Sequence, residues 1–307
     1  MPITINLNEI NDQELTKNWL DLYDTIFTDC DSVLWQDNSV IAGAPETINA
    51  LQNLGKRVYF VTNNSTKTRS ELCVKARGMG FQVTEEQIIA PSYTIAEYLK
   101  LNLNSEQKVY LIGSPAMAKE LDSLGIEHFG LGEDIVEPNW ASILPDIDEQ
   151  TRRENIGAVL IGFDEHFSYN KMIKAANFLV QNDECLFLAT NVDAVSKFPK
   201  YSVPGTGAIL RGIEACVGRE AVVMGKPNPV VCEQLLRAEN IKPERSLMIG
   251  DCHKADVLFG KNCGFATMLV GTGRYKWSDV LELQKNDSKQ YIPDFYASSL
   301  ADLRTYL

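Results

Sequence analysis

The chain carries a series of short, almost uninterrupted apolar runs, and these constrain its fold more than any other feature. Each run is followed by small or polar residues, and segments with helical character lie between the runs. Runs of Val, Ile and Leu without alternation are typical of strands buried on both faces of a parallel sheet. Because strands and helices alternate, we predict a doubly wound α/β fold. The predicted strands are 58–61, 109–112, 158–161, 186–189, 221–224 and 247–249.

Helix signals stand between these runs. Pro45 suits the first turn of a helix, and Gly55 marks the end of the same helix. Thr68 and Glu71 have the spacing of a capping box ahead of a second helix. Further helices are predicted at 170–180 and 228–238.

The middle of the chain, residues 101–205, has its own alternation of strands and helices. The segment Pro204-Gly205-Thr206-Gly207 is a candidate return hinge, because proline and glycine favour changes of chain direction. We therefore predict a discontinuous core of residues 1–100 and 206–307, with residues 101–205 inserted as a second α/β domain. A chain of 307 residues is long enough for one large domain or two.

Charge and composition exclude some classes of partner. A net charge of −12 disfavours nucleic acid or an anionic membrane as the main partner. An anionic small substrate remains compatible, since a bound cation can reverse the field within one cleft. No secretory signal is recognisable, and no apolar run approaches the roughly 20 residues that cross a bilayer. Seven cysteines without a C-x-x-C pair suit reduced thiols, so we expect a cytoplasmic protein.

Two carboxylates follow the apolar residues Ile26 and Phe27, in the segment Asp29-Cys30-Asp31. Residues two apart in an extended segment project to the same side, so we expect both carboxylates at one edge and Cys30 buried on the other face. Two ionised carboxylates this close repel each other unless one is protonated or a cation is present. Such a pair suits a nucleophile beside a proton donor, held by a hard metal ion such as Mg²⁺. An isolated D-x-D is also compatible with a simple polar turn.

Three further polar segments follow predicted strands, and ligands of open α/β sheets bind at the carboxyl ends of the strands. Thr62, Asn63 and Asn64 offer a hydroxyl, amides and backbone N–H groups that can hold phosphate oxygens. Lys226 lies between glycine and proline and can neutralise phosphate charge. Taken singly, the first segment is better explained as a simple helix cap, and Lys226 is equally well explained as a solvated surface lysine.

The last segment contains two aspartates, Asp251 and Asp256. We predict that Asp251 completes a magnesium site and that Asp256 orients a metal-bound water without touching the ion. Four segments at the ends of four strands together indicate one site.

In this order, the four segments resemble the motifs of the haloacid dehalogenase superfamily of aspartate-nucleophile phosphatases. They read FTDCDSVLW, VTNNST, MGKPNP and MIGDCHKADVLFGKNCGF. With GFDEHFSY, ATNVD and VPGTG in the inserted part, the chain is similar to the subfamily of phosphoglycolate phosphatases, pyridoxal-phosphate phosphatases (chronophin) and 4-nitrophenylphosphatase-like enzymes. The resemblance implies a Rossmann-like core with an inserted α/β cap, a small phosphorylated metabolite as substrate, and a homodimer of the kind that related capped phosphatases often form.

The resemblance also implies a mechanism. Asp29 would attack phosphorus and form an aspartyl phosphate, and Asp31 would protonate the leaving oxygen and later activate water. The metal ligands would be the carboxylates of Asp29 and Asp251 and the backbone carbonyl of Asp31. The cap would exclude water and select the substrate, with Phe163, Glu165 and Asp193 as candidate contacts.

The chain departs from the subfamily pattern at two places near these motifs. Ser32 stands where glycine is usual, at a cost of roughly 1 kcal/mol or more if its φ is positive. Lys254 replaces an acidic residue of the fourth motif. Both changes leave open a catalytically weak pseudo-phosphatase that acts as a binding protein.

The pyridoxal-phosphate enzymes of the subfamily tend to have a histidine in the loop after Asp193. This chain has none there, so the resemblance favours phosphoglycolate as the substrate. Pyridoxal phosphate and a general 4-nitrophenyl phosphatase activity remain the alternatives. A dinucleotide-binding oxidoreductase is disfavoured, because Gly271-Thr272-Gly273 is an isolated fragment of the glycine-rich motif. Oxidation of Cys30 is a further hypothesis, since it would disturb both neighbouring carboxylates.

Overall fold

The computed structural model describes residues 4–9, 19–134, 140–145, 147, 149, 155–197, 200–286 and 288–307. Contacts along the chain separate two compact units. The first, here called the core unit, comprises Met1–Thr62, Arg69–Ile89 and Lys226–Leu307, and the second, the inserted unit, comprises Asn63–Thr68 and Ala90–Gly225. The domain boundaries expected from the sequence stay a prediction.

The core unit is built on a parallel sheet of seven strands in the order β1-β16-β15-β14-β2-β5-β6. The chain adds strands on one side of β2 and later on the other, so the order switches between β2 and β14. This is the doubly wound topology predicted from the apolar runs. The strands are β1 (Ile5–Asn6), β2 (Thr25–Thr28), β5 (Arg57–Val61), β6 (Ile88–Ile89), β14 (Ser246–Gly250), β15 (Ala266–Val270) and β16 (Phe295–Ala297).

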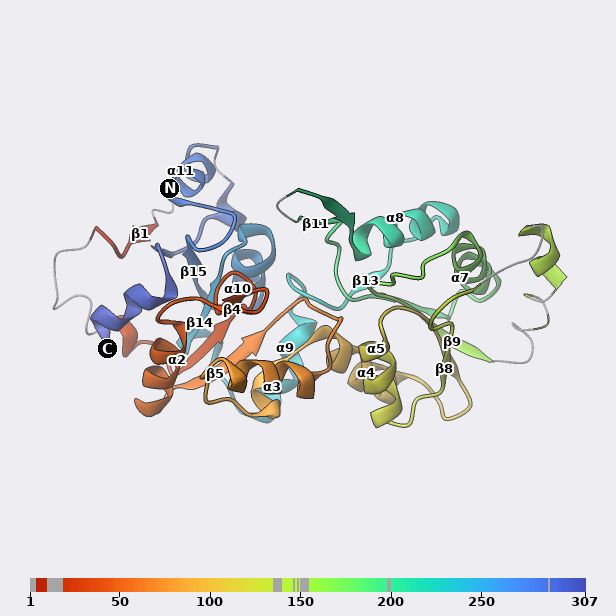
Figure 1. Ribbon diagram of the computed structural model, residues 1–307, viewed down its shortest axis with the longest axis horizontal. Coiled ribbons are helices and arrows are strands. Elements are labelled where there is room, and N and C mark those ends of the chain that lie inside the picture. Colours follow the sequence, from red (N-terminus) through yellow and green to blue (C-terminus); the bar gives the residue numbers. More distant parts are fainter. Residues whose placement is uncertain are drawn as a thin grey trace. The chain divides into compact units, whose positions relative to one another are not determined.

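Helices cover both faces of this sheet (Figure 1). On one face, Phe27 and Tyr59 pack with apolar residues of α9 and α10 in a single cluster. On the other, α2 contacts β5, and Phe60 lies edge-on to Phe81, which follows α3. Side chains of adjacent strand residues point to opposite faces, and because both faces are covered, the central strands are almost entirely buried and mostly apolar. The helices are α2 (Ala44–Asn53), α3 (Arg69–Gly78), α9 (Val230–Ala238), α10 (Leu258–Cys263) and α11 (Trp277–Lys285).

The inserted unit has its own parallel sheet of five strands, in the order β13-β10-β9-β7-β8. Helices α7 and α8 lie side by side and share one apolar cluster with β9 (Figure 1). The strands are β7 (Lys108–Ile112), β8 (His128–Phe129), β9 (Ile156–Ile161), β10 (Leu186–Ala189), β13 (Val222–Val223) and an antiparallel pair, β11 (Val195–Lys197) and β12 (Ser202–Pro204). The helices are α4 (Pro91–Asn102), α5 (Pro115–Ser123), α7 (Tyr169–Gln181) and α8 (Thr206–Val217).

Short elements complete the described part of the chain. A small antiparallel hairpin joins β3 (Trp35–Gln36) and β4 (Ser39–Val40). Short 3₁₀-helical segments cover Glu85–Gln87, Trp140–Ile143, Pro243–Arg245, Lys289–Tyr291 and Leu300–Tyr306, and a π-helical turn covers His253–Val257. None of the described helices is long and apolar enough to cross a membrane.

One local expectation was wrong. Strand β2 ends at Thr28, so neither Asp29 nor Asp31 lies in a regular strand, and alternation along a strand does not place their side chains. Instead, Asp31 forms an isolated bridge with Trp35, and a hydrogen-bonded turn at residues 32–34 connects the two. Cys30 is buried as expected, at 1% exposure.

Candidate active site

Two acidic residues leave the sheet side by side at the point where the strand order switches. Thr28 of β2 pairs with Ile249 of β14, and the backbone N–H of Asp29 donates to the carbonyl of Ile249 at 2.8 Å. Asp29 is the first residue after β2, and Asp251 is the first after β14. The switch point of an open α/β sheet is the usual place for a ligand.

A third carboxylate, that of Asp256, joins them from the π-helical turn. Carboxylate oxygens of Asp29, Asp251 and Asp256 all lie within 4.8 Å of one another. A Cβ atom on Gly250 would stand 2.2 Å from the Asp256 carboxyl, so only glycine lets the turn pack against the end of β14. One Asp256 oxygen accepts from the backbone N–H of Cys252 at 3.0 Å, which fixes the side chain in place.

The ammonium group of Lys226 lies between two of these carboxylates. Its Nζ donates to Asp29 Oδ1 at 2.6 Å, to Asp256 Oδ1 at 2.7 Å and to the carbonyl of Val61 at 2.8 Å. Three donors thus have three acceptors, and the residue is only 3% exposed. Burial lowers the pKa of Lys226, but the carboxylates of Asp256 and Asp29 outweigh this effect and raise it, so the ammonium stays charged.

The carboxylates of Asp29, Asp251 and Asp256 carry more negative charge than Lys226 alone can balance. Burial raises the pKa of Asp29 well above its usual value, against the opposing effect of Lys226, and the Asp256 and Asp251 charges raise it further. Burial and the charge of Asp256 raise the pKa of Asp251 to about 6. Three ionised carboxylates beside one ammonium leave two negative charges uncompensated. A hard divalent cation with oxygen ligands, such as Mg²⁺, fits this donor set.

The two oxygens of Asp256 are already engaged, one by Lys226 and one by Cys252. Asp29 and Asp251 are therefore better placed than Asp256 to donate an oxygen directly to a metal ion. The division between direct ligands and an orienting residue stays a prediction.

Asp31 lies in a tight turn, not at the end of a strand. The carboxylate Oδ1 of Asp31 accepts a hydrogen bond from the indole Nε1 of Trp35 at 2.9 Å. Ser32 has a φ of 66°, a left-handed conformation that glycine, the usual residue at this position, adopts more easily. The Ser32 backbone is held in this conformation by Thr272, whose hydroxyl donates to the Ser32 carbonyl at 2.6 Å.

The loop after β15 supports two of the predicted site segments, and sequence reasoning missed it. Besides the contact of Thr272, the backbone N–H of Arg274 donates to Asp251 Oδ2 at 3.3 Å. A Cβ atom on Gly273 would stand 1.9 Å from the same oxygen, so glycine is required here. The fragment Gly271-Thr272-Gly273, set aside as an incomplete dinucleotide motif, thus supports the acidic cluster. Its place directly after a strand was the signal that could have identified it.

The predicted phosphate-binding segment is divided between the two units. Thr62 directly follows β5, is buried in the core unit, and donates its backbone N–H to Ile89 at 3.1 Å. Asn63 and Asn64 group with the inserted unit. The side-chain oxygen of Asn64 accepts from the backbone N–H and the hydroxyl of Thr66, at 2.8 and 2.7 Å. Their contact with phosphate stays a prediction.

The candidate substrate contacts of the inserted unit lie near the ends of its strands. Phe163 follows β9 and is half-buried, whereas Glu165 and Asp193 are exposed. The backbone N–H of Asp193 donates to Asn191 Oδ1 at 3.1 Å, which orders the start of its loop. No contact in the structure tests these residues, and their role stays a prediction.

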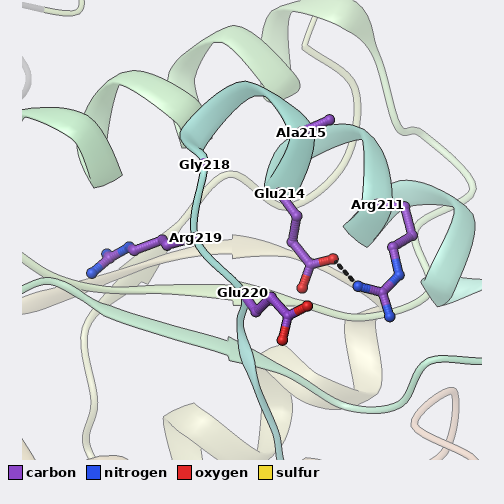
Figure 2. A pocket seen from close by; sticks show the side chains of 6 residues that line it. All are labelled: Arg211, Glu214, Ala215, Gly218, Arg219 and Glu220. Atoms are coloured by element: carbon purple, nitrogen blue, oxygen red, sulfur yellow. Dashed lines mark hydrogen bonds and ion pairs between the residues drawn. The ribbon is translucent and has the colours of Figure 1, made fainter.

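A hollow on the surface of the inserted unit offers no competing chemistry (Figure 2). Its two arginines are already engaged. Arg211 pairs with Glu214 at 2.6 Å, and Arg219 donates to the carbonyls of Asp183 and Cys185. The hollow contains none of the predicted site residues; it is lined by Arg211, Glu214, Ala215, Gly218, Arg219 and Glu220.

Comparison with known proteins agrees with this geometry. Residues 26–127 match the haloacid dehalogenase-like hydrolases, and residues 223–303 match a second family described as HAD-hydrolase-like. The chain is 37% identical to glycerol-3-phosphate phosphatase of Mus musculus over 297 residues, with 91% of this chain and 89% of that protein covered. The chain belongs to the haloacid dehalogenase-like hydrolases.

Other proteins with phosphatase names resemble the chain over a similar share of its length. Phosphoglycolate phosphatase 1A, chloroplastic, of Arabidopsis thaliana is 35% identical, with 92% of this chain and 77% of that protein covered. The structure of p-nitrophenyl phosphatase from Archaeoglobus fulgidus superposes with a TM-score of 0.78 at 26% identity, with 93% of this chain and 99% of that chain covered. The predicted family, the predicted fold class and the prediction of a hydrolase are thereby confirmed.

Proposed function

We propose that this haloacid dehalogenase-type phosphatase is magnesium-dependent and hydrolyses small phosphomonoesters through an aspartyl phosphate on Asp29. The observation that carries the proposal is the placement of Asp29. Its carboxylate sits at the switch point of the sheet, bonded to Lys226 and within 4.8 Å of two further carboxylates. An acidic cluster of this kind is costly without a cation and a substrate phosphate to balance it.

In the proposed reaction, Asp29 attacks phosphorus and Asp31 gives a proton to the departing oxygen. Asp31 then takes a proton from the water that hydrolyses the aspartyl phosphate. Bound Mg²⁺ would offset the charge on the phosphate oxygens, with Asp29, the Asp31 carbonyl and Asp251 holding it. Lys226 holds the Asp29 side chain in position and offers positive charge beside the transferred group.

The proposed substrates are small anionic phosphomonoesters of the phosphoglycolate type. The Arabidopsis relative is a phosphoglycolate phosphatase by name, which supports this class. Glycerol 3-phosphate is the second candidate, because the Mus musculus relative is named for it. We further propose that the inserted unit selects among them through Phe163, Glu165 and Asp193. A homodimer and a cytoplasmic location stay predictions.

The test is a phosphate-release assay with phosphoglycolate, glycerol 3-phosphate, pyridoxal phosphate and 4-nitrophenyl phosphate, each with and without Mg²⁺. We expect magnesium-dependent release that Asp29→Asn abolishes. Asp164→Asn is the matched control, because Asp164 is also a buried carboxylate bonded to a buried lysine, Lys171, but within the inserted unit. A wild-type protein that binds these esters without turnover would instead indicate a pseudo-phosphatase.

A further inference from the structure

The turn that carries Asp31 is closed by its own backbone. The carbonyl of Cys30 accepts from the backbone N–H of Leu34 at 2.8 Å and from that of Trp35 at 3.2 Å. The N–H of Ser32 donates to the carbonyl of Trp35 at 2.7 Å. These bonds close a turn between Cys30 and Trp35, so that the side chain of Trp35 lies beside that of Asp31.

The indole ring of Trp35 is held from several sides. It is 1% exposed and lies edge-on to the rings of Phe60 and Phe81, with centroids 6.3 and 6.0 Å away. The ammonium of Lys75 stands 4.7 Å from the centroid of the indole ring. A large side chain packed in this way has no room to change rotamer. Its N–H therefore has a fixed direction, toward Asp31 Oδ1 at 2.9 Å.

The hydrogen bond makes the two oxygens of Asp31 unequal. An indole N–H donates and never accepts, so Oδ1 must be the acceptor in this bond. A proton on the Asp31 carboxyl is therefore directed to Oδ2. The carboxyl also cannot rotate about its last bond without breaking this part-buried hydrogen bond, which would leave the N–H of the buried indole unsatisfied.

We propose that Trp35 is a positioning residue for proton transfer, and that it reserves Oδ2 of Asp31 as the oxygen that protonates the leaving group. This inference rests on the proposed function. As the bond between phosphorus and the leaving oxygen breaks and the bond to Asp29 forms, the proton moves from Asp31 Oδ2 to the leaving oxygen. The water that hydrolyses the aspartyl phosphate returns a proton to Asp31.

Leaving groups separate this role from simple packing. An alkoxide is a strong base and needs a proton as it departs, whereas 4-nitrophenolate is a weak base and departs without one. Loss of a correctly directed proton donor must therefore slow alkyl esters more than nitrophenyl esters. A structural defect that loosens the site would slow both alike.

The decisive variant is Trp35→Phe, which keeps an aromatic ring against Phe60 and Phe81 but has no N–H. The quantity to compare is kcat/KM for glycerol 3-phosphate and for 4-nitrophenyl phosphate, since it reports the steps up to transfer of the phosphoryl group. General acid catalysis typically contributes about 10²–10⁴ in rate, and misdirection should forfeit part of it. We expect a fall of about 10- to 100-fold for the alkyl ester and of about 3-fold or less for the nitrophenyl ester.

Two controls make the result specific. Phe81→Leu disturbs the packing of the same indole but leaves its N–H, and it should affect both substrates equally. In an Asp31→Asn background, Trp35→Phe should produce no further difference between the substrates, because the two residues act as one unit. Should Trp35→Phe not fold, benzothienylalanine at this position keeps both rings and lacks only the N–H.

Equal losses on the two substrates in Trp35→Phe, or in the benzothienylalanine protein, would overturn the inference while leaving the phosphatase intact. A wild-type protein that releases phosphate from none of the esters tested under the proposed function, phosphoglycolate included, would instead refute that function, and the positioning role with it. The two failures are thus distinguishable within a single set of assays.

Discussion

Replacement of Lys226 by methionine tests the electrostatics of the acidic cluster. Methionine has a similar length and fills the space, but it leaves the carboxylates of Asp29 and Asp256 without the ammonium that contacts them at 2.6 and 2.7 Å. Removal of one partner from a buried ion pair typically costs about 3–5 kcal/mol, because the other charge is left buried. We expect Lys226→Met to lose about this much free energy of unfolding at pH 7 in the absence of Mg²⁺.

Urea unfolding followed by tryptophan fluorescence is the appropriate assay. Trp19, Trp35 and Trp277, three of the four tryptophans, belong to the core unit that contains the cluster. A second variant, Lys226→Met/Asp256→Asn, removes one of the two stranded charges. We expect it to be more stable than Lys226→Met alone by at least about 1 kcal/mol, the lower end of the cost of a buried unpaired group.

Lys171→Met is the matched control. Lys171 is buried in the inserted unit and bonded to a single carboxylate, Asp164, so its replacement also destabilises the protein. Only the Lys226 variant should abolish phosphate release by the remaining folded protein. The reasoning would be refuted by a loss below about 1 kcal/mol for Lys226→Met, the level of an exposed ion pair. It would also fail if Asp256→Asn destabilised the lysine variant further.

Four other changes have defined outcomes. Ser32→Gly should raise the free energy of unfolding by about 0.5–1 kcal/mol in urea titration, because glycine adopts a φ of 66° without strain; a decrease would contradict this. Gly273→Ala should weaken Mg²⁺ binding at least about tenfold by calorimetry, the usual lower bound for residues that orient a ligand, since its Cβ would collide with Asp251; unchanged affinity would refute it. The folded chain binds a proton on Asp251 more tightly than the unfolded chain, because folding raises this pKa from 3.8 to about 6. Without Mg²⁺, the free energy of unfolding should therefore fall as the pH rises from about 4 to about 6, and added Mg²⁺ at pH 7 should restore it. Urea titrations across this range measure the effect, and a flat profile would contradict it. Peroxide should oxidise the exposed Cys216 before Cys30, as followed by peptide mass spectrometry, because burial raises the pKa of the Cys30 thiol; early oxidation of Cys30 would restore the hypothesis of redox control at the site.

The sheet was predictable from the sequence because its signal is local. Strands buried on both faces require continuous apolar runs, and the runs at 58–61 and 247–249 correspond to β5 and β14. The run at 221–224 is reduced to β13, Val222–Val223, with Val222 exposed. Helix 228–238 begins at Val230 in the structure, within the usual uncertainty of a helix end.

The acidic site was partly predictable for a geometric reason. In a parallel sheet, polar residues that follow different strands meet at one edge, so Asp29 and Asp251 could be brought together without coordinates. The turn around Ser32 and the support from Thr272 could not be foreseen. They depend on which segments become neighbours in space, and the sequence Gly271-Thr272-Gly273 does not indicate that it will contact Ser32 and Asp251.

The edge strand β1 connects distant parts of the chain. Ile5 and Asn6 pair with Phe295 and Tyr296 of β16, and the hydroxyl of Thr4 donates to the carbonyl of Pro293 at 2.7 Å. Strand β1 therefore cannot pair in this sheet until the chain has been synthesised as far as Phe295 and Tyr296. The border of this sheet is completed late, and shortening the chain beyond β15 would expose the backbone of its early residues to other chains.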